Sequence, residues 1–156
     1  MTDSLLTLVR GHPGSGKSTY ARTLLEKAPE GTAHLENDQF FIGLDGVYAF
    51  DPSQHEAAKA WCLSATTRAL HSGRSVIVSN TFTTRAELAP YLDLGYPVKV
   101  VEMGLDFASE HNVPVAVIEA KKKQFEPHEG ATVINDPTYF LEQMPDGLRR
   151  RRRRQP

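Results

Sequence analysis

The sequence has only one cysteine, Cys62, and no long apolar run among its 156 residues. A single cysteine excludes an internal disulfide framework, and it excludes a zinc site that needs two or more cysteine ligands. The longest apolar runs, such as residues 115–118, are far shorter than the roughly 20 residues of a membrane-spanning helix. The first residues lack the basic and apolar regions of a secretory signal. We therefore expect no membrane partner and a cytoplasmic location.

Net charge is also small, at −1, but it is distributed unevenly. Residues 149–154 are six consecutive arginines, and the residues before them carry a net charge of −7. Basic blocks of this kind often contact polyanions such as nucleic acids, although a tail can also act only as a solubilising segment. The sequence therefore favours a nucleic-acid partner and leaves the solubilising role open.

Apolar residues make up 40% of the chain and charged residues 24%, which is typical of one globular domain. Short apolar runs predict strands at residues 5–9, 33–36, 75–79 and 98–102. Stretches with helical spacing or high alanine content predict helices at residues 18–27, 53–71, 85–92 and 113–126. This alternation predicts a three-layer α/β fold with a parallel sheet of about four strands, whose carboxyl ends bind ligands. We assign residues 1–126 to this domain and residues 127–156 to a C-terminal extension that includes the arginine tail.

Residues 11–18 read Gly-His-Pro-Gly-Ser-Gly-Lys-Ser and fit the pattern G-x-x-x-x-G-K-[ST]. They lie between a predicted strand and a predicted helix, where the backbone N–H groups of such a loop surround phosphates. Lys17 is expected to reach the β- and γ-phosphates of ATP, and Ser18 is expected to bind Mg²⁺. The alternative is a glycine-rich turn without a ligand. The predicted nucleotide-binding residues are Gly11, His12, Pro13, Gly14, Ser15, Gly16, Lys17, Ser18 and Thr19.

A carboxylate that follows the second predicted strand, Asp38, is a candidate general base. It is expected to face the ligand crevice, where it can accept the proton of an acceptor hydroxyl, and it is a candidate Mg²⁺ ligand together with Ser18. The alternative is that Asn37 or Asp38 only caps the following segment. The N-K-x-D guanine signature of GTPases is absent, and the chain has no room for the second lobe of an ATPase motor. We therefore prefer a small kinase, with Lys17 and Asp38 as its catalytic residues.

Four segments resemble the polynucleotide kinase-like P-loop kinases, many of which are encoded by phages. These segments are the phosphate loop at residues 11–19, Asn37-Asp38 with the aromatic residues after them, residues 76–83 (VIVSNTFT), and residues 111–114 (HNVP) with Ile118 and Phe125. The resemblance covers roughly residues 5–126. It implies a P-loop NTPase-type three-layer sandwich, ATP and Mg²⁺ as cofactors, and Asp38 as the general base.

The sequence departs from the family's pattern on the acceptor side. Phe41 stands where polynucleotide kinases place an arginine that holds the acceptor phosphate, and residues 107–110 (FASE) offer no lid arginine. Asn80 stands where relatives often carry a second carboxylate. An arginine acting on the transition state is worth about 10³ to 10⁵ in rate, so substitutes are expected among Lys121–Lys123, Arg85 and the arginine tail.

Two acceptors are therefore open for the predicted kinase. A phenylalanine at position 40 or 41 can stack on a nucleobase, although both side chains can equally serve core packing. The family that the chain resembles includes phage kinases that phosphorylate the hydroxymethyl group of 5-hydroxymethyluracil in DNA. We predict transfer of the γ-phosphate of ATP to a hydroxyl of DNA or another polynucleotide, either on such a base or at a 5′ end. The alternative is a non-catalytic or slowly hydrolysing ATP-binding module that docks on nucleic acid.

Overall fold

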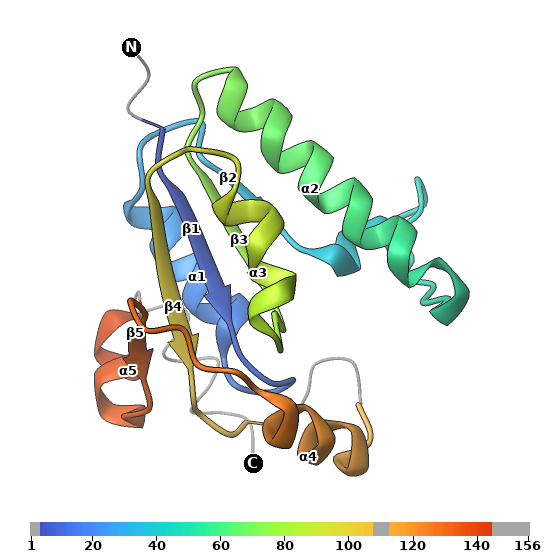
Figure 1. The fold of residues 1–156 in the computed structure, drawn as a ribbon, viewed down its shortest axis with the longest axis vertical. Helices are drawn as coiled ribbons and strands as arrows, with labels where there is room; N and C mark the ends of the chain where they lie inside the picture. The colour runs from blue at the N-terminus through green and yellow to red at the C-terminus, as the bar shows by residue number, and fades with distance from the viewer. Residues whose placement is uncertain (1–3, 108–112, 145–156) are drawn as a thin grey trace.

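The computed structural model describes residues 4–107 and 113–144, which form a five-stranded parallel sheet with helices on both sides (Figure 1). The strands lie in the order β2-β3-β1-β4-β5. In chain order they are β1 (Leu6–Arg10), β2 (Ala33–Leu35), β3 (Val76–Asn80), β4 (Val98–Met103) and β5 (Thr132–Ile134). Arg10 at the end of β1 lies opposite Asn80 and Glu102, so the carboxyl ends of the central strands share one edge.

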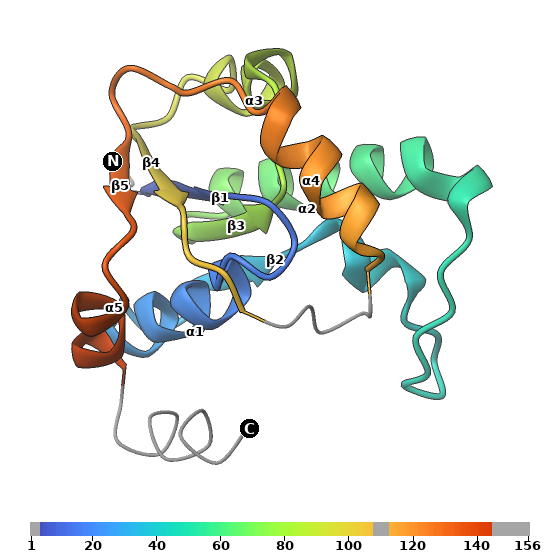
Figure 2. The ribbon, with the colours of Figure 1, turned by 90° about the horizontal axis from the view of Figure 1, so that it is seen from below.

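Helices cover both faces of this sheet (Figure 2). The α-helices are α1 (Lys17–Lys27), α2 (His55–His71), α3 (Arg85–Leu92), α4 (Val115–Gln124) and α5 (Pro137–Gln143), and two short 3₁₀ helices are η1 (Asn37–Phe41) and η2 (Pro52–Gln54). Leu6 and Leu8 of β1 pack with residues of α2 and α3, whereas Val9 packs with residues of α1 and α5. Because side chains alternate across a strand, β1 contributes to two separate cores. The predicted three-layer α/β fold is confirmed.

The segment after residue 126 supplies part of the sheet and part of the core. β5 pairs with β4, and α5 packs on the same face as α1. Ile134, Phe140 and Met144 are at most 2% exposed. The sheet therefore has one strand more than the four that the sequence indicated, and that strand comes from the segment assigned to a C-terminal extension. The arginine tail lies outside the described residues.

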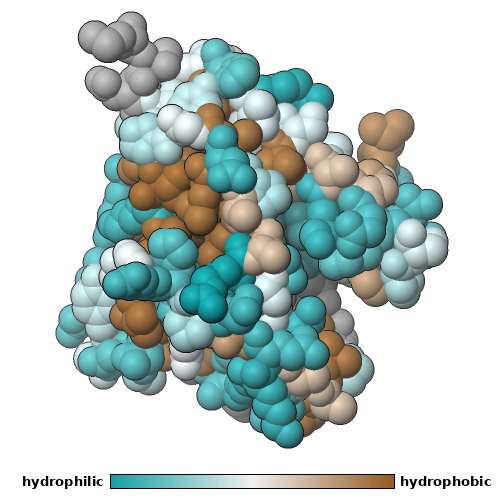
Figure 3. Space-filling model, viewed as in Figure 1, coloured by the Kyte–Doolittle hydropathy of each residue, from teal (hydrophilic) through white to brown (hydrophobic). Residues whose placement is uncertain are grey.

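Apolar side chains gather on the upper left of the face in Figure 3, where Figure 1 places the starts of β1 and β4, and polar side chains cover most of the rest.

No helix in residues 4–107 or 113–144 is long and apolar enough to cross a membrane. The helix expected at residues 113–126 is shorter, because Pro114 occupies the N-cap position and Phe125 leaves the helix to pack against Arg10.

Candidate functional site

The loop between β1 and α1 has the backbone that a phosphate-binding loop requires. Gly14 and Gly16 adopt φ angles of 82° and 90°, in the left-handed region that favours glycine. Gly16 is the N-cap of α1, and the Tyr20 N–H donates to its carbonyl at 2.9 Å. The Phe107 N–H donates to the Gly14 carbonyl at 2.6 Å, which ties the loop to the segment after β4. The amino end of α1 therefore points its first N–H groups toward the ligand side of the sheet.

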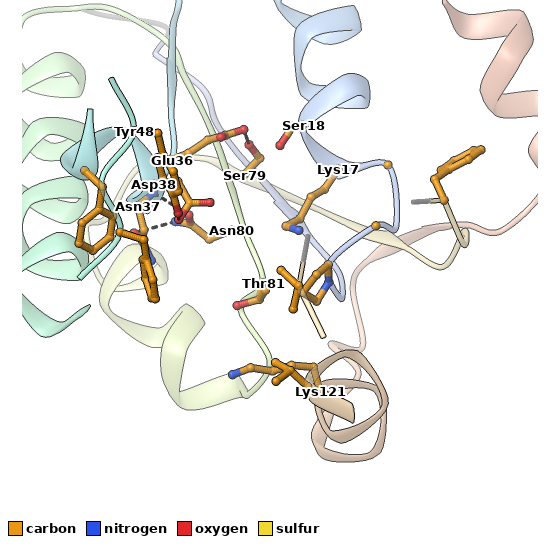
Figure 4. Close-up of a pocket in the computed structure, with 18 of the residues that line it drawn as sticks. Lys17, Ser18, Glu36, Asn37, Asp38, Tyr48, Ser79, Asn80, Thr81 and Lys121 are labelled. Carbon is orange, nitrogen blue, oxygen red and sulfur yellow. Dashed lines mark hydrogen bonds between the residues drawn. The ribbon is translucent and has the colours of Figure 1, made fainter. Parts of the chain in front are cut away.

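A cavity of about 460 Å³ lies at the carboxyl ends of the strands, beside this loop (Figure 4). Its wall is built from the phosphate loop, η1, the connection from η1 to α2, the end of β3 and the first turns of α4. The lining residues are Pro13, Gly14, Gly16, Lys17, Ser18, Thr19, Glu36, Asn37, Asp38, Phe41, Tyr48, Phe50, His55, Ser79, Asn80, Thr81, Phe107, Val113, Pro114, Val117 and Lys121.

The predicted nucleotide-binding residues divide into two groups. Pro13, Gly14, Gly16, Lys17, Ser18 and Thr19 line the cavity, whereas Gly11, His12 and Ser15 are not among its lining residues. A Cβ at Gly11 would lie 2.4 Å from the Ser15 hydroxyl oxygen and 2.7 Å from the Met103 carbonyl oxygen, so only glycine fits there. His12 supports the loop through its carbonyl, which accepts a 3.5 Å hydrogen bond from the Lys17 ammonium.

A glutamate that sequence analysis did not single out stands next to Ser18. Glu36 follows β2 directly, and its Oε1 accepts a 2.6 Å hydrogen bond from the Ser79 hydroxyl. The same oxygen lies 3.2 Å from His34 Nε2, and the carboxylate faces the Ser18 hydroxyl (Figure 4). Burial acts to raise the pKa of Glu36, but the interactions with His34, Ser79 and Ser18 outweigh it and lower the pKa to about 2. Glu36 is therefore ionised at neutral pH.

Asp38 lies in η1, close to the end of β3. Asn37 and Asn80 tie these elements together, because the Asn37 backbone N–H donates to Asn80 Oδ1 at 2.8 Å and Asn80 Nδ2 donates to Asn37 Oδ1 at 3.1 Å. The Tyr48 hydroxyl donates to Asp38 Oδ1 at 3.5 Å. Burial, followed by the charge of Asp38, raises the pKa of Tyr48. The N-cap of η1 is Glu36, so neither Asn37 nor Asp38 caps this helix.

Aromatic side chains form the wall beside Asp38. The Phe41 ring centroid lies 6.3 Å from that of Tyr48 and 5.0 Å from that of Phe50, both in edge-to-face arrangements. Phe41 is 7% exposed and Phe50 is 52% exposed, so the cluster extends from the core to the surface. Phe40 instead lies 6.3 Å from the ring of Trp61 in α2 and does not line the cavity. Phe41 therefore lies where it can both pack in the core and stack on a base in the cavity.

The basic residues predicted to replace a lid arginine lie in different places. Lys121 lines the cavity from α4, at the lower edge of the view in Figure 4. Lys122 instead forms a 2.8 Å ion pair with Asp106, and Lys123 is exposed. Arg85 begins α3 and is not a lining residue. Residues 108–110 of the predicted lid, residues 111–112 of the HNVP segment and the arginine tail lie outside the described residues.

The structure thus brings Lys17, Ser18, Asp38, Phe41 and Lys121 to one cavity. Sequence reasoning missed Glu36, Tyr48 and Phe50. Glu36 directly follows a short strand with no clear alternation, and the two aromatic residues follow η1 in a connection that carries no motif. The one available signal was their closeness in sequence to Asp38.

Comparison with known proteins agrees with this architecture. Over 91 residues the chain is 38% identical to NEDD4-binding protein 2 of Homo sapiens, a match that covers 58% of this chain and 5% of that protein, so the chain spans a small part of that relative's length. A sugar kinase from Janibacter sp. HTCC2649 superposes with a TM-score of 0.66 at 15% identity, over 90% of this chain and 91% of that chain. A chain of the Pnkp1/Rnl/Hen1 RNA repair complex superposes with a TM-score of 0.54 at 19% identity, over 96% of this chain and 46% of that chain.

The two structural likenesses show a P-loop kinase-like fold. Residues 6–121, which include the phosphate loop, Asp38 and Lys121, match the AAA domain family AAA_33, and the chain therefore belongs to this family.

Proposed function

We propose that this chain is an ATP-dependent phosphotransferase whose acceptor is a hydroxyl group of a nucleic acid. The observation that carries the proposal is that a phosphate-binding loop, a carboxylate and an aromatic wall line the same cavity. Figure 4 shows Asp38 between Tyr48 on one side and Lys17 on the other. A donor phosphate on the loop and a flat acceptor on the aromatic wall would therefore meet at Asp38.

The donor side fits a nucleoside triphosphate. Backbone N–H groups at the start of α1 and the ammonium of Lys17 are suited to phosphate oxygens. Ser18 and nearby carboxylates offer the hard oxygen donors that Mg²⁺ prefers. Bound with ATP, Mg²⁺ would neutralise charge on the β- and γ-phosphates.

The transfer requires one proton acceptor and one leaving group. Asp38 would take the proton of the acceptor hydroxyl as its oxygen forms a bond to the γ-phosphorus. The bond between that phosphorus and the β,γ-bridging oxygen breaks, and ADP leaves. The lysine and the backbone N–H groups would stabilise the charge that develops on the phosphoryl oxygens.

The acceptor side favours a base over a terminal phosphate. Phe41 takes the place where an arginine would hold the acceptor phosphate, and it stands in an aromatic cluster with Tyr48 and Phe50. Aromatic rings stack on bases with a stabilisation of about 1–3 kcal/mol per base. The preferred acceptor is therefore a hydroxymethyl group on a base such as 5-hydroxymethyluracil in DNA, ahead of a polynucleotide 5′-OH. The arginine tail would add affinity for the nucleic-acid backbone.

The direct test follows the label of γ-labelled ATP with Mg²⁺. The acceptors are a 5′-hydroxyl oligonucleotide, internally hydroxymethylated DNA with blocked ends, a simple sugar, and no acceptor. We expect label on the hydroxymethylated DNA. Label on the sugar alone would assign a small-molecule kinase, and ATP binding with no labelled acceptor would instead support a non-catalytic or slowly hydrolysing ATP-binding module.

The Asp38→Asn variant tests the general base. Loss of the base is expected to reduce kcat by about 10² to 10⁴, the usual contribution of general base catalysis, while ATP affinity stays near that of the wild type. Asp93→Asn is the matched control, because Asp93 is exposed and is not a lining residue. Equal loss of kcat in both variants, or none in either, would remove Asp38 from the mechanism.

A further inference from the structure

Glu36 is a largely buried, ionised carboxylate at the phosphate side of the cavity. Its side chain is 18% exposed, and its Oε1 contacts His34 of β2 and Ser79 of β3. A charge withdrawn from water is costly unless hydrogen bonds compensate it, so these partners on two neighbouring strands indicate a carboxylate held in one position. Figure 4 shows the carboxylate beside Ser79 and facing Ser18.

The end of β3 carries no carboxylate that could serve in its place. Ser79 offers only a hydroxyl, and the Asn80 amide is occupied by its reciprocal pair with Asn37. Asp38 hydrogen-bonds to Tyr48, on the aromatic side of the cavity. Within the described part of the chain, the carboxylate that faces the Ser18 hydroxyl is therefore that of Glu36, directly after β2.

We propose that Glu36 is the carboxylate that, with Ser18, holds the Mg²⁺ of the bound nucleotide. The inference rests on the proposed function, because the ion would arrive with ATP. Mg²⁺ is commonly held by one or two carboxylates together with substrate phosphates and water, and not by an all-protein cage. Consistent with this, residues 4–107 and 113–144 contain no cluster of three or more His, Cys, Asp or Glu side chains suited to a metal ion. Ser79 and His34 act as positioning residues for Glu36.

The test measures metal binding rather than turnover. Mn²⁺ serves as the probe, and electron paramagnetic resonance reports its binding to the protein saturated with a non-hydrolysable ATP analogue. For Glu36→Gln we expect the Mn²⁺ affinity to fall at least about 10-fold, since even outer partners of metal ligands are worth about 10- to 100-fold. Affinity for the analogue in EDTA should be unchanged or higher, because a negative charge near the phosphates is removed.

Two control variants test whether the loss of Mn²⁺ affinity is specific to Glu36. Glu30→Gln removes an exposed carboxylate away from the cavity and should leave Mn²⁺ affinity as in the wild type. Asp38→Asn tests the earlier prediction that Asp38 is the metal carboxylate, and we expect it to change Mn²⁺ affinity less than 3-fold. Mn²⁺ affinity within 2-fold of the wild type for folded Glu36→Gln would overturn the inference, as would a loss confined to Asp38→Asn.

A second variant covers the case in which Glu36→Gln does not fold. Glu36 Oε1 lies 2.6 Å from the Ser79 hydroxyl oxygen. In the double substitution Glu36→Ser/Ser79→Asp, residue 79 of β3 therefore carries the carboxylate, which occupies nearly the same place in the cavity. The single variant Glu36→Ser is the reference for the double variant. A Mn²⁺ affinity at least about 10-fold below the wild type in Glu36→Ser that recovers in the double variant supports the inference, whereas an affinity within 2-fold of the wild type in folded Glu36→Ser overturns it. A wild-type chain that does not bind the ATP analogue at all would instead contradict the proposed function.

Discussion

At the scale of single residues, Arg10 connects the core to the loop beside the cavity. It is fully buried at the end of β1, where Nη1 lies 3.0 Å from Glu102 Oε1 and Nε donates to the Phe82 carbonyl at 2.9 Å. Its guanidinium lies 4.1 Å above the Phe125 ring. Phe82 has a φ of 42°, which is strained for a bulky side chain, and it follows the lining residue Thr81. Arg10 therefore holds a strained loop in place with hydrogen bonds to its backbone.

Replacing this arginine should cost far more than replacing a surface arginine. Arg10→Met leaves Glu102 buried without its cation, and removing one partner of a buried ion pair costs about 3–5 kcal/mol of unfolding free energy. The double variant Arg10→Met/Glu102→Gln should recover part of that loss, because no charge stays buried and the amide can still accept from the His128 N–H. Urea unfolding of the two variants and the wild type measures this, with Arg22→Met as the control. A double variant less stable than Arg10→Met would show that the ion pair is not the main contribution of Arg10.

At the scale of helices and strands, α4 presents three consecutive lysines with different surroundings. Lys121 faces the cavity, Lys122 pairs with Asp106, and Lys123 is exposed. Removing one fixed hydrogen-bond donor from the reacting group lowers kcat by about 10²–10³. A lysine side chain is flexible and less well fixed than such a donor. We therefore expect a smaller effect for Lys121→Gln, a decrease in kcat of about 10- to 100-fold. Lys123→Gln is the matched control from the same helix and should retain wild-type kcat. Similar kcat values for the two variants would assign the charge compensation to another group.

The elements also show how far the sequence could predict this molecule. The phosphate loop and the longer strands and helices follow from local patterns, because Gly14 and Gly16 need left-handed backbone and β1 and β3 are buried apolar runs. β5 has only three residues, and its stability comes from pairing with β4, which no local pattern encodes. The Glu36 site joins residues from β2, β3 and α1 that are up to 61 positions apart, so it exists only after the sheet has formed.

At the scale of the whole molecule, charge is separated between the body and the tail. The first 148 residues carry a net charge of −7, which opposes binding to a polyanion, and residues 149–154 carry six positive charges. Within residues 127–144, which the structure describes, the C-terminal segment buries Ile134, Phe140 and Met144, and these precede the arginines. Stability and nucleic-acid affinity can therefore be separated by a truncation at the tail.

Deletion of residues 149–156 is expected to leave the unfolding midpoint and the ATP affinity unchanged and to weaken DNA binding. Each lost phosphate contact should reduce the slope of log K against log salt concentration by about 0.7 to 0.9. DNA binding measured by fluorescence anisotropy at several salt concentrations gives that slope, and a chain in which residues 149–154 are glutamines controls for tail length. Transfer to hydroxymethylated DNA should fall in both variants through a higher KM with little change in kcat, since the cavity residues are intact. An unchanged salt slope would show that the arginines do not contact DNA, and the acceptor would then have to be held by the cavity alone.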